Sequence, residues 1–378
     1  MDLTRPKFDE EELQLVKQCL DSGWVTQGPL TAEFERLLSV RHEVSYALAT
    51  TSCTAALHLA TMALELGKGD DVIVPAFTWV TSAHCAEYVG ANVVFADVDS
   101  STYNLDPAAF EAAITKQTRA VVVVHLFGLA AKVGEILAIA RRHNLLVIED
   151  AACAIGTTYD GKPVGGFGDV GCFSFHPRKV ITTGEGGMVT TNQALIAGRV
   201  RSLRNHGATG HLEAGQGPPK AYTMSPFDIL GYNLRLSDIQ AAVGIAQMRK
   251  LDRLLQERGA LATRYTELLQ GLDNVQLPAS PERCGHTYQS YVIRLVQGGV
   301  GKRNGVMDAL SERGIQTRPG THAVHRLGFY TRKYKIHPEQ FPNAALCEDT
   351  TITLPLFPGM TEDQQQIVVS CLKQSLTH

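Results

Sequence analysis

The chain has 378 residues, of which 44% are hydrophobic and 19% are charged. This length predicts two domains around a large core, and the apolar content excludes a disordered chain. The longest apolar runs, such as residues 120–124, are far shorter than the roughly 20 residues of a membrane-spanning helix. A formal net charge of −3, without a long run of one sign, gives no footprint for nucleic acid or an anionic membrane. Small molecules are therefore the expected ligands.

Eight cysteines are scattered along the chain, and no two of them form a Cys-x-x-Cys pair. The first residues, MDLTRPKFDEEELQLV, carry acidic side chains where a signal peptide would carry a basic and then an apolar stretch. These features predict reduced thiols in the cytoplasm, and no metal site is predicted.

The first two thirds of the chain alternates short β-branched runs with stretches of helical periodicity. This alternation is typical of strand–helix–strand units in a mostly parallel sheet with helices on both faces. Strands are predicted at residues 45–49, 71–74, 93–96, 120–124 and 145–148, and helices at 54–66, 82–88, 107–114 and 134–143.

Beyond residue 150 the pattern changes to glycine-rich turns and two short strands, 171–175 and 187–190, which indicates the antiparallel end of a mixed sheet. The segment 205–228 is polar and broken by Gly and Pro. A loop of that length is usually functional or mobile.

Ser237 caps a long amphipathic helix, predicted at 238–269, which would bridge to a smaller α+β domain. That domain is predicted to contain strands at 290–295 and 316–318 and helices at 303–313, near Ala344 and near Glu362. The chain is thus divided into a large α/β domain, residues 1–245, and a small domain, residues 246–378.

Ser52, Cys53 and Thr54 directly follow a predicted strand and open a helix. The first N–H groups of a helix have no partner within it, and with the helix dipole they favour a phosphate. The hydroxyls of Ser52 and Thr54 are available to add bonds. An ordinary N-cap is the alternative interpretation, because caps prefer Ser and Thr.

Glu149 and Asp150 end the predicted strand LLVI. Because open α/β sheets bind ligands at the carboxyl edge of their strands, Asp150 is predicted to face that crevice. Side chains alternate along a strand, so Glu149 is predicted to point to the opposite face as a structural partner. A helix cap or a turn is the alternative role for Asp150.

Lys179 follows an apolar strand and is flanked by a loop with three glycines, TTGEGGM. Glycines allow close approach to a bound group, and an amine in a protected pocket can attack a carbonyl. A lone lysine is more often a solvated surface charge. However, a phosphate-type helix start, an acidic strand end and a glycine-framed lysine together meet the needs of pyridoxal 5'-phosphate: a phosphate anchor, a partner for the pyridinium nitrogen and a Schiff-base amine.

The stretch Gly166-Phe-Gly168-Asp-Val-Gly171 matches the GxGxxG pattern of dinucleotide sites. That motif should follow a strand and open a helix, whereas this one follows turn residues and leads into a predicted strand. We therefore interpret these glycines as turn residues.

Six motifs together resemble one known family: GWVTQGP (23–29), TSCTAALHLA (51–60), VPAFTWV (74–80), VIEDAACAIG (147–156), FSFHPRKVITTGEGGMV (173–189) and GYNLRLSDIQAA (231–242). With them the sequence resembles the DegT/DnrJ/EryC1/StrS family of aminotransferases, which place an amine on nucleotide-linked ketosugars. The resemblance implies the pyridoxal-phosphate-dependent transferase fold type I, an α/β fold. It has a mostly parallel, mixed, seven-stranded sheet flanked by helices and a smaller α+β C-terminal domain.

The resemblance implies a role for several residues around the cofactor. Lys179 stands where the family holds the cofactor as a Schiff base, and Asp150 where it holds the pyridinium nitrogen. Trp79 matches the aromatic residue that stacks on the pyridine ring, with a position in the core as its alternative. Asn233 matches a residue that reaches the cofactor phosphate of a neighbouring subunit, which implies a homodimer with shared active sites.

The same resemblance implies phosphate contacts from Ser174 and from the backbone amides of Cys53 and Thr54, with Ser52 at the same helix start. Two positions depart from the family pattern. Cys53 replaces a Gly or Ala but leaves the backbone donor intact. Cys153 replaces a Gln, His or Glu near the cofactor O3′, and a thiol is a weak hydrogen bonder.

The substrate contacts rest on Arg235 and on the cluster RPGTHAVHR. Arg235 matches a position that contacts the donor's carboxylate or the substrate. Arg318, His322 and His325 are predicted to line a cleft for the diphosphate of a sugar nucleotide, and a solvated basic turn is the alternative.

The function that the resemblance implies is ping-pong transamination, with glutamate as the expected amino donor and Lys179 as the group that moves the proton. The acceptor is expected to be a nucleotide-linked 4-keto-6-deoxyhexose, aminated at C4 as in the perosamine-synthase-like branch. Amination of a 3-keto sugar and a catalytically silent, cofactor-binding regulatory role are the alternatives. A dehydratase of the same family would carry a histidine in place of Lys179.

Overall fold

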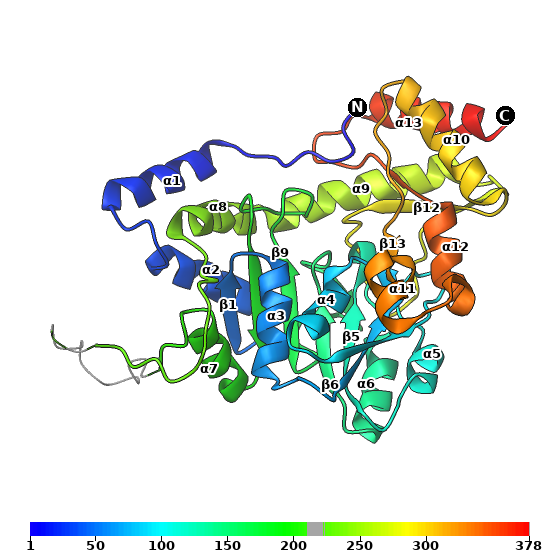
Figure 1. The fold of residues 1–378 in the computed structure, drawn as a ribbon. Coiled ribbons are helices and arrows are strands. Elements are labelled where there is room, and N and C mark those ends of the chain that lie inside the picture. Colours follow the sequence, from blue (N-terminus) through cyan, green and yellow to red (C-terminus); the bar gives the residue numbers. More distant parts are fainter. Residues whose placement is uncertain (210–221, 223, 378) are drawn as a thin grey trace.

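The computed structural model describes residues 1–209, 222 and 224–377. A large sheet carries helices on both faces, and two consecutive helices, α8 and α9, run above it to a smaller part that contains the C-terminal helix (Figure 1). Of the polar loop predicted at 205–228, residues 210–221 and 223 lie outside the described residues.

The large sheet has seven strands, and they confirm the predicted parallel arrangement with an antiparallel end. In spatial order they are β1 (Tyr46–Thr50), β10 (Gly187–Thr191), β9 (Val170–Ser174), β6 (Leu146–Asp150), β5 (Thr118–Val124), β2 (Asp71–Pro75) and β4 (Asn92–Ala96). Strand β10 runs antiparallel to both β1 and β9, and the other pairs in this sheet are parallel.

Side chains of the central strand β5 alternate between two apolar cores. Ala120 and Val122 belong to the core on one face, and Val121 and Val123 belong to the core on the other. The first face is covered by α3 (Cys53–Ala63), α4 (Thr81–Tyr88) and α7 (Ala194–Leu203), and the second by α2 (Pro29–Arg41), α5 (Pro107–Ala112), α6 (Val133–Arg142) and α8 (Asp238–Arg249). Burial on both faces explains why this strand is a continuous run of valines.

The strands and helices predicted up to residue 190 all occur, with ends that differ by at most three residues. No element was predicted for α1 (Glu10–Ser22), α2 or α7. Short elements complete the large part: β3 (Phe77–Thr78), the hairpin of β7 (Thr158–Tyr159) and β8 (Lys162–Pro163), and the 3-10 turn η1 (Leu126–Gly128).

The single helix predicted at 238–269 is wrong, because two helices, α8 and α9 (Leu251–Leu269), meet at Lys250. The backbone N–H of Lys250 donates to the carbonyl of Gln247, three residues back, which tightens the turn at the junction. The Lys250 ammonium lies 2.9 Å from a carboxylate oxygen of Asp9 and 2.5 Å from one of Glu12, next to α1. Charge pairing with the N-terminal segment therefore accompanies the break.

The smaller part is α+β. Its elements are β11 (Val275–Gln276), β12 (Tyr291–Leu295), α10 (Gly299–Glu312), β13 (His322–Ala323), η2 (Val324–Arg326), α11 (Gly328–Tyr334), η3 (Pro338–Gln340), α12 (Pro342–Thr350), β14 (Thr351–Leu354) and α13 (Glu362–Leu376). The strand predicted at 316–318 is wrong: only Arg318 forms a single bridge, to Thr353. Pro319 follows it and has no N–H to continue a ladder.

The large and small parts are linked by α9 and by a strand pair, and neither link coincides with the predicted division at 245/246. That division lies within α8, whereas the core contacts of α9 change from the large part at Leu254 to the small part at Ala262. Strand β13 pairs with β3 of the large part, with His322 opposite Thr78. Among the described residues, the structure contains no helix that is long and apolar enough to cross a membrane.

Candidate active site

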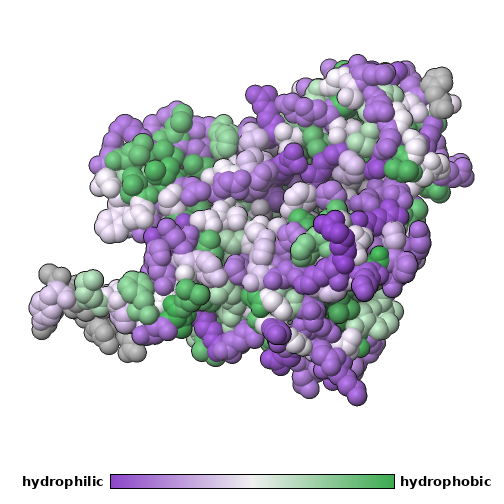
Figure 2. All heavy atoms as spheres, in the orientation of Figure 1, coloured by the Kyte–Doolittle hydropathy of each residue, from purple (hydrophilic) through white to green (hydrophobic). Residues whose placement is uncertain are grey.

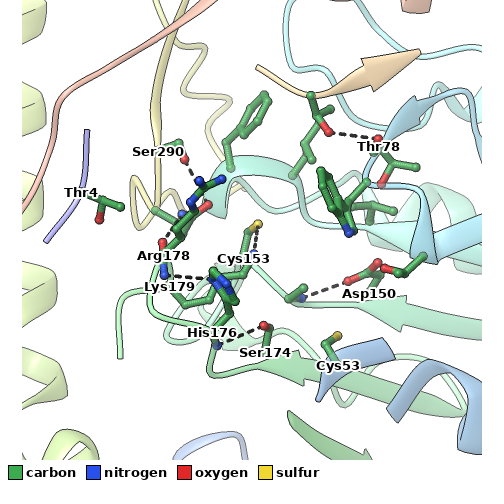
Figure 3. Close-up of a pocket in the computed structure, with 18 of the residues that line it drawn as sticks. Thr4, Cys53, Thr78, Asp150, Cys153, Ser174, His176, Arg178, Lys179 and Ser290 are labelled. Carbon is green, nitrogen blue, oxygen red and sulfur yellow. Dashed lines mark hydrogen bonds between the residues drawn. The ribbon is translucent and has the colours of Figure 1, made fainter. Parts of the chain in front are cut away.

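A cavity of about 430 Å³ opens at the carboxyl edge of the large sheet (Figure 3). Its walls combine the start of α3, the ends of β6 and β9, the turn that carries Lys179, and segments of the small part. Nine of the residues singled out from the sequence line it: Ser52, Cys53, Thr54, Trp79, Asp150, Cys153, Ser174, Lys179 and Arg318. The volume is within the range of ordinary small-molecule sites.

Asp150 ends β6 with its carboxylate at the cavity, as predicted. One carboxylate oxygen accepts a hydrogen bond of 2.6 Å from the hydroxyl of Ser82, and the other accepts one of 3.1 Å from the backbone N–H of Ala152. Ser82 is therefore part of the site, although sequence analysis did not single it out. Two donors orient the carboxylate and leave further acceptor capacity toward the cavity.

Glu149 points to the opposite face, and the structural role predicted for it is confirmed. Its carboxylate is fully buried and accepts hydrogen bonds from the backbone N–H groups of Gly165, Phe167 and Gly168, at 2.7 to 2.8 Å. It also accepts one of 3.0 Å from Nε2 of His125, whose Nδ1 accepts from a backbone N–H. The turn that contains the GxGxxG match thus binds the chain's own carboxylate, through Phe167 and Gly168 of the match and through Gly165 just before it, in line with the interpretation of its glycines as turn residues.

Lys179 lies in the turn that follows β9. Its Nζ is 3.1 Å from Sγ of Cys153, so the predicted lysine and the unusual thiol face each other in the cavity (Figure 3). The backbone N–H of Lys179 donates to the carbonyl of His176. The carbonyl of the preceding residue, Arg178, accepts a hydrogen bond from the side chain of Gln289.

The start of α3 presents backbone donors to the cavity. The Ser52 hydroxyl caps the helix by accepting from the N–H of Ala55, and within the described residues the N–H groups of Cys53 and Thr54 have no acceptor. A Cβ on Gly187 would lie 2.4 Å from the Ser52 carbonyl oxygen and 2.6 Å from the Cys53 nitrogen, so only glycine lets β10 approach this turn. Burial raises the pKa of the Cys53 thiol, which leaves the backbone as its contribution to an anion site.

Trp79 stands at the mouth of the cavity with 52% of its surface exposed, which is inconsistent with the core position that was its alternative. Its ring lies 5.6 Å from that of His322, which is itself exposed. The pairing of β13 with β3 brings these two side chains together from distant parts of the chain.

The basic cluster RPGTHAVHR does not act as one surface. Arg318 lines the cavity, and one of its guanidinium N–H groups donates to the carbonyl of Gly320. His325, by contrast, is fully buried: its Nε2 bonds the carbonyl of Pro338 and its ring packs against Phe341. The prediction that His325 lines a cleft for a diphosphate is therefore wrong, because His325 lies in the 3-10 turn η2, where its side chain and that of Val324 are buried.

Asn233 and Arg235 lie outside the walls of this cavity. Asn233 is exposed and forms a backbone bridge with Asn205, and the Arg235 guanidinium donates to the Asn205 side chain at 2.6 Å. In the described part of the chain, neither side chain forms a hydrogen bond with Ser52, Asp150, Ser174 or Lys179.

Pyridoxal phosphate fits this arrangement on three counts. Unpaired backbone donors at the start of α3 suit its phosphate, the carboxylate of Asp150 suits its ring nitrogen, and the amine of Lys179 suits its aldehyde. All three face the same cavity. Sequence analysis did not single out Ser82 and Gln289, which join the site only through tertiary contacts, or Arg178, which precedes Lys179 and lines the cavity. Arg178 lies inside a quoted motif and Ser82 lies two residues after another, which was the available signal.

Comparisons with known proteins agree with this chemistry. Residues 6–373 match the DegT/DnrJ/EryC1/StrS aminotransferase family. The GDP-perosamine synthase of Caulobacter vibrioides is 39% identical over 373 residues, which cover 98% of this chain and 97% of that protein. The spore coat polysaccharide biosynthesis protein SpsC of Bacillus subtilis is 36% identical over 373 residues, which cover 97% and 95%.

Solved structures show the same fold. Spr1654 of Streptococcus pneumoniae, assigned as a sugar aminotransferase and solved in its PMP form, superposes with a TM-score of 0.94 at 27% identity, covering 100% of this chain and 99% of that one. The same protein has been solved in its PLP form.

Fold, cavity and relatives define a pyridoxal-phosphate-dependent aminotransferase that acts on sugars. The chain belongs to the DegT/DnrJ/EryC1/StrS aminotransferase family.

Proposed function

We propose that this enzyme transfers an amino group from glutamate to C4 of a nucleotide-linked 4-keto-6-deoxyhexose. The observation that carries the proposal is the amine of Lys179 and the carboxylate of Asp150 on the walls of one cavity. The relative named GDP-perosamine synthase, at 39% identity over nearly the whole chain, supports the choice of substrate class.

Bound pyridoxal phosphate supplies the electron sink for breaking the bond between hydrogen and the amino-bearing carbon. Lys179 Nζ would hold the cofactor, and its amine is placed to move the proton from that carbon. Asp150, oriented by Ser82, binds the protonated ring nitrogen. Cys153, which lies against Lys179 Nζ, closes the same side of the cavity.

The phosphate would be held by the backbone N–H groups of Cys53 and Thr54 and by the hydroxyls of Ser52 and Ser174. Trp79 would cover the pyridine ring. These assignments rest on the unpaired donors at the start of α3 and on the position of the four polar residues and the tryptophan at the cavity wall.

Arg318 and His322 are assigned to the diphosphate of the sugar nucleotide. Arg318 forms no ion pair with a carboxylate in the described residues, and most of its donors are free to meet a ligand. His322 is exposed and lies beside Trp79, which lines the cavity, although His322 itself is not part of the cavity wall. Arg235 is assigned to a substrate carboxylate, in the site of a second subunit.

The decisive experiment loads the enzyme with glutamate and then offers a panel of nucleotide-linked 3-keto and 4-keto sugars. The products are identified by mass spectrometry and by the position of the new amine in NMR spectra. A C4-aminated sugar supports the proposal, and amination at C3 replaces it by the alternative regiochemistry. If glutamate leaves the cofactor spectrum unchanged and no sugar is aminated, the chain is a silent, cofactor-binding member.

We also propose that the enzyme is a homodimer whose sites are completed by both subunits. Asn233 is exposed outside its own cavity and is adjacent to an exposed apolar run that includes Phe227, Ile229 and Leu230, the last with 84% of its surface accessible. Figure 2 shows further apolar side chains over α1, where Leu13 and Leu20 are exposed. Exposed apolar surface of this extent is typical of protein interfaces.

Mixing two inactive variants tests the shared site. Asn233→Ala and Lys179→Ala subunits, after verified exchange, should regain activity in heterodimers, because one of the two composite sites then contains neither lesion. Recovery approaches about half of the wild-type activity per heterodimer by the counting of two-fold symmetric sites. Absence of recovery would assign Asn233 to the site of its own subunit.

A further inference from the structure

Gln289 links the small part of the molecule to the turn that carries Lys179. It stands two residues before β12, its side chain is mostly buried, and it lines the cavity. Its Nε2 donates a hydrogen bond of 2.7 Å to the backbone carbonyl of Arg178. That carbonyl belongs to the peptide group that immediately precedes Lys179.

This peptide group is held at both ends. Its carbonyl accepts from Gln289, and its N–H, which belongs to Lys179, donates to the carbonyl of His176 at 2.8 Å. Rotation of the peptide plane would break both bonds. Because the plane sets the direction in which the Lys179 side chain leaves the backbone, these two bonds determine where the amine enters the cavity.

Gln289 is itself fixed in place from the other side. The guanidinium of Arg258, on α9 and only 1% exposed, donates to the carbonyl of Gln289 at 2.6 Å and to that of Tyr288 at 3.1 Å. The hydroxyl of Ser290 donates to Oε1 of Gln289, which orients the amide so that Nε2 faces Arg178. Burial lowers the pKa of Arg258 to about 10, so it remains charged at neutral pH.

We propose that Gln289 is a positioning residue for Lys179, acting through the peptide group between Arg178 and Lys179. The proposal rests on the proposed role of Lys179 as the lysine that holds the cofactor. The side-chain amide supplies a donor to this carbonyl, and the buried Arg258 holds the backbone of Gln289 in place. Gln289 thereby makes the placement of the lysine depend on the small part of the molecule.

The test replaces Gln289 by methionine, which keeps the length of the side chain but removes the donor. Gln365→Met is the matched control, because Gln365 is also buried and donates to a backbone carbonyl, that of Leu261, away from the cavity. We expect Gln289→Met to lower the rates of both half-reactions together by about 10- to 100-fold, as small misplacements of a reacting group do. The KM for the sugar nucleotide and the retention of cofactor should stay unchanged.

Two further readouts separate positioning from a general structural effect. The midpoint of the pH titration of the near-visible cofactor band should shift in Gln289→Met and not in Gln365→Met. Amide hydrogen exchange in peptides that cover residues 176–183 should be faster in Gln289→Met even in cofactor-free protein, with the rest of the chain unchanged.

In a Gln289→Glu variant, lowering the pH should partly restore the rates that the substitution reduces. An ionised carboxylate cannot donate to the Arg178 carbonyl, whereas a protonated one can, so the defect should shrink as pH falls. A wild-type titration midpoint and wild-type exchange in Gln289→Met would overturn the proposal. If instead Lys179→Ala keeps the cofactor band, the proposed role of Lys179 fails, and this separate result identifies which proposal is wrong.

Discussion

Two neighbouring carboxylates at the end of β6 have opposite surroundings. Glu149 is fully buried and accepts from four N–H donors of its own chain, whereas Asp150 accepts from Ser82 and Ala152 and presents its remaining capacity to the cavity. They are consecutive in the chain, and the alternation of side chains along a strand places them on opposite faces. A carboxylate that the protein satisfies completely is structural, and one that it satisfies in part is available to a ligand.

Two groups of backbone N–H donors differ in the same way: one is satisfied within the chain, and the other faces the cavity. The glycine turn at 165–168 directs its N–H groups at Glu149, so its capacity for an anion is used within the chain. At the start of α3, the N–H groups of Cys53 and Thr54 have no acceptor in the described residues and face the cavity. A glycine-rich motif is therefore weaker evidence for a ligand than donors that the fold leaves unused.

Among the groups that face the cavity, replacement of Lys179 should have the largest effect on turnover. Lys179→Ala removes the amine that holds the cofactor and moves the proton, so turnover should fall by about four orders of magnitude or more. The near-visible absorbance of the lysine-bound cofactor should disappear as well. Turnover close to the wild-type value would show that another group performs this chemistry.

Asp150→Asn should separate chemistry from folding. The amide has nearly the same shape and can still bond Ser82, but it carries no charge to stabilise the protonated ring nitrogen. We expect each half-reaction to slow by at least about 100-fold, while the free energy of unfolding changes by less than about 1 kcal/mol. Stopped-flow spectra with glutamate measure the first half-reaction, and an unaltered rate would refute the role of Asp150.

Glu149→Gln should show the reverse pattern. The new amide turns an N–H group toward donors that need an acceptor, and buried unsatisfied donors cost about 1–3 kcal/mol each, so unfolding should become easier by about 3 kcal/mol. Denaturant titration of the two variants side by side measures the difference. Equal stability of Glu149→Gln and Asp150→Asn would contradict the division into structural and functional carboxylates.

The stability contributed by Glu149 depends on pH with a definite sign. Burial alone would raise the pKa of this carboxyl group, but the hydrogen bonds from His125 and the glycine turn outweigh it and lower the pKa. A group with a lowered folded-state pKa stabilises the fold above its unfolded pKa, about 4.3, and this stability is lost as pH falls through the folded pKa. The gap between wild type and Glu149→Gln should therefore be widest near neutral pH and narrow below about pH 4.3.

The parts of the fold and site that depend on local pattern could be predicted from the sequence. The opposite faces of Glu149 and Asp150 follow from strand alternation, and the two cores around β5 follow from its run of valines. The break at Lys250 could not be predicted in this way, because its carboxylate partners are about 240 residues away in the sequence.

Residues that join the site through tertiary contacts were missed for the same reason. Gln289 reaches the lysine turn from the segment before β12, and nothing in its local sequence distinguishes it from a surface glutamine. The prediction for the cluster around Arg318 was wrong for the opposite reason, because its residues are close in the sequence but do not share one surface. A 3-10 turn begins at Val324, and His325 within it is buried, whereas Arg318 and His322 are not.

That division within the basic cluster leads to the smallest of the expected effects. Arg318→Gln removes a charge at the cavity wall and should raise the KM for the sugar nucleotide by about 10-fold, because one charged hydrogen-bonded contact is worth roughly 1.5–3 kcal/mol. His322→Ala, outside the cavity wall, should raise it less. The glutamate half-reaction should stay unchanged in both variants, since only the second substrate carries the diphosphate.

His325→Gln is the control variant. The His325 side chain lies in the core, so this substitution should lower the free energy of unfolding and leave the KM for the sugar nucleotide unaltered. A rise in KM for His325→Gln equal to that for Arg318→Gln would mean that the cluster binds the substrate as one surface after all.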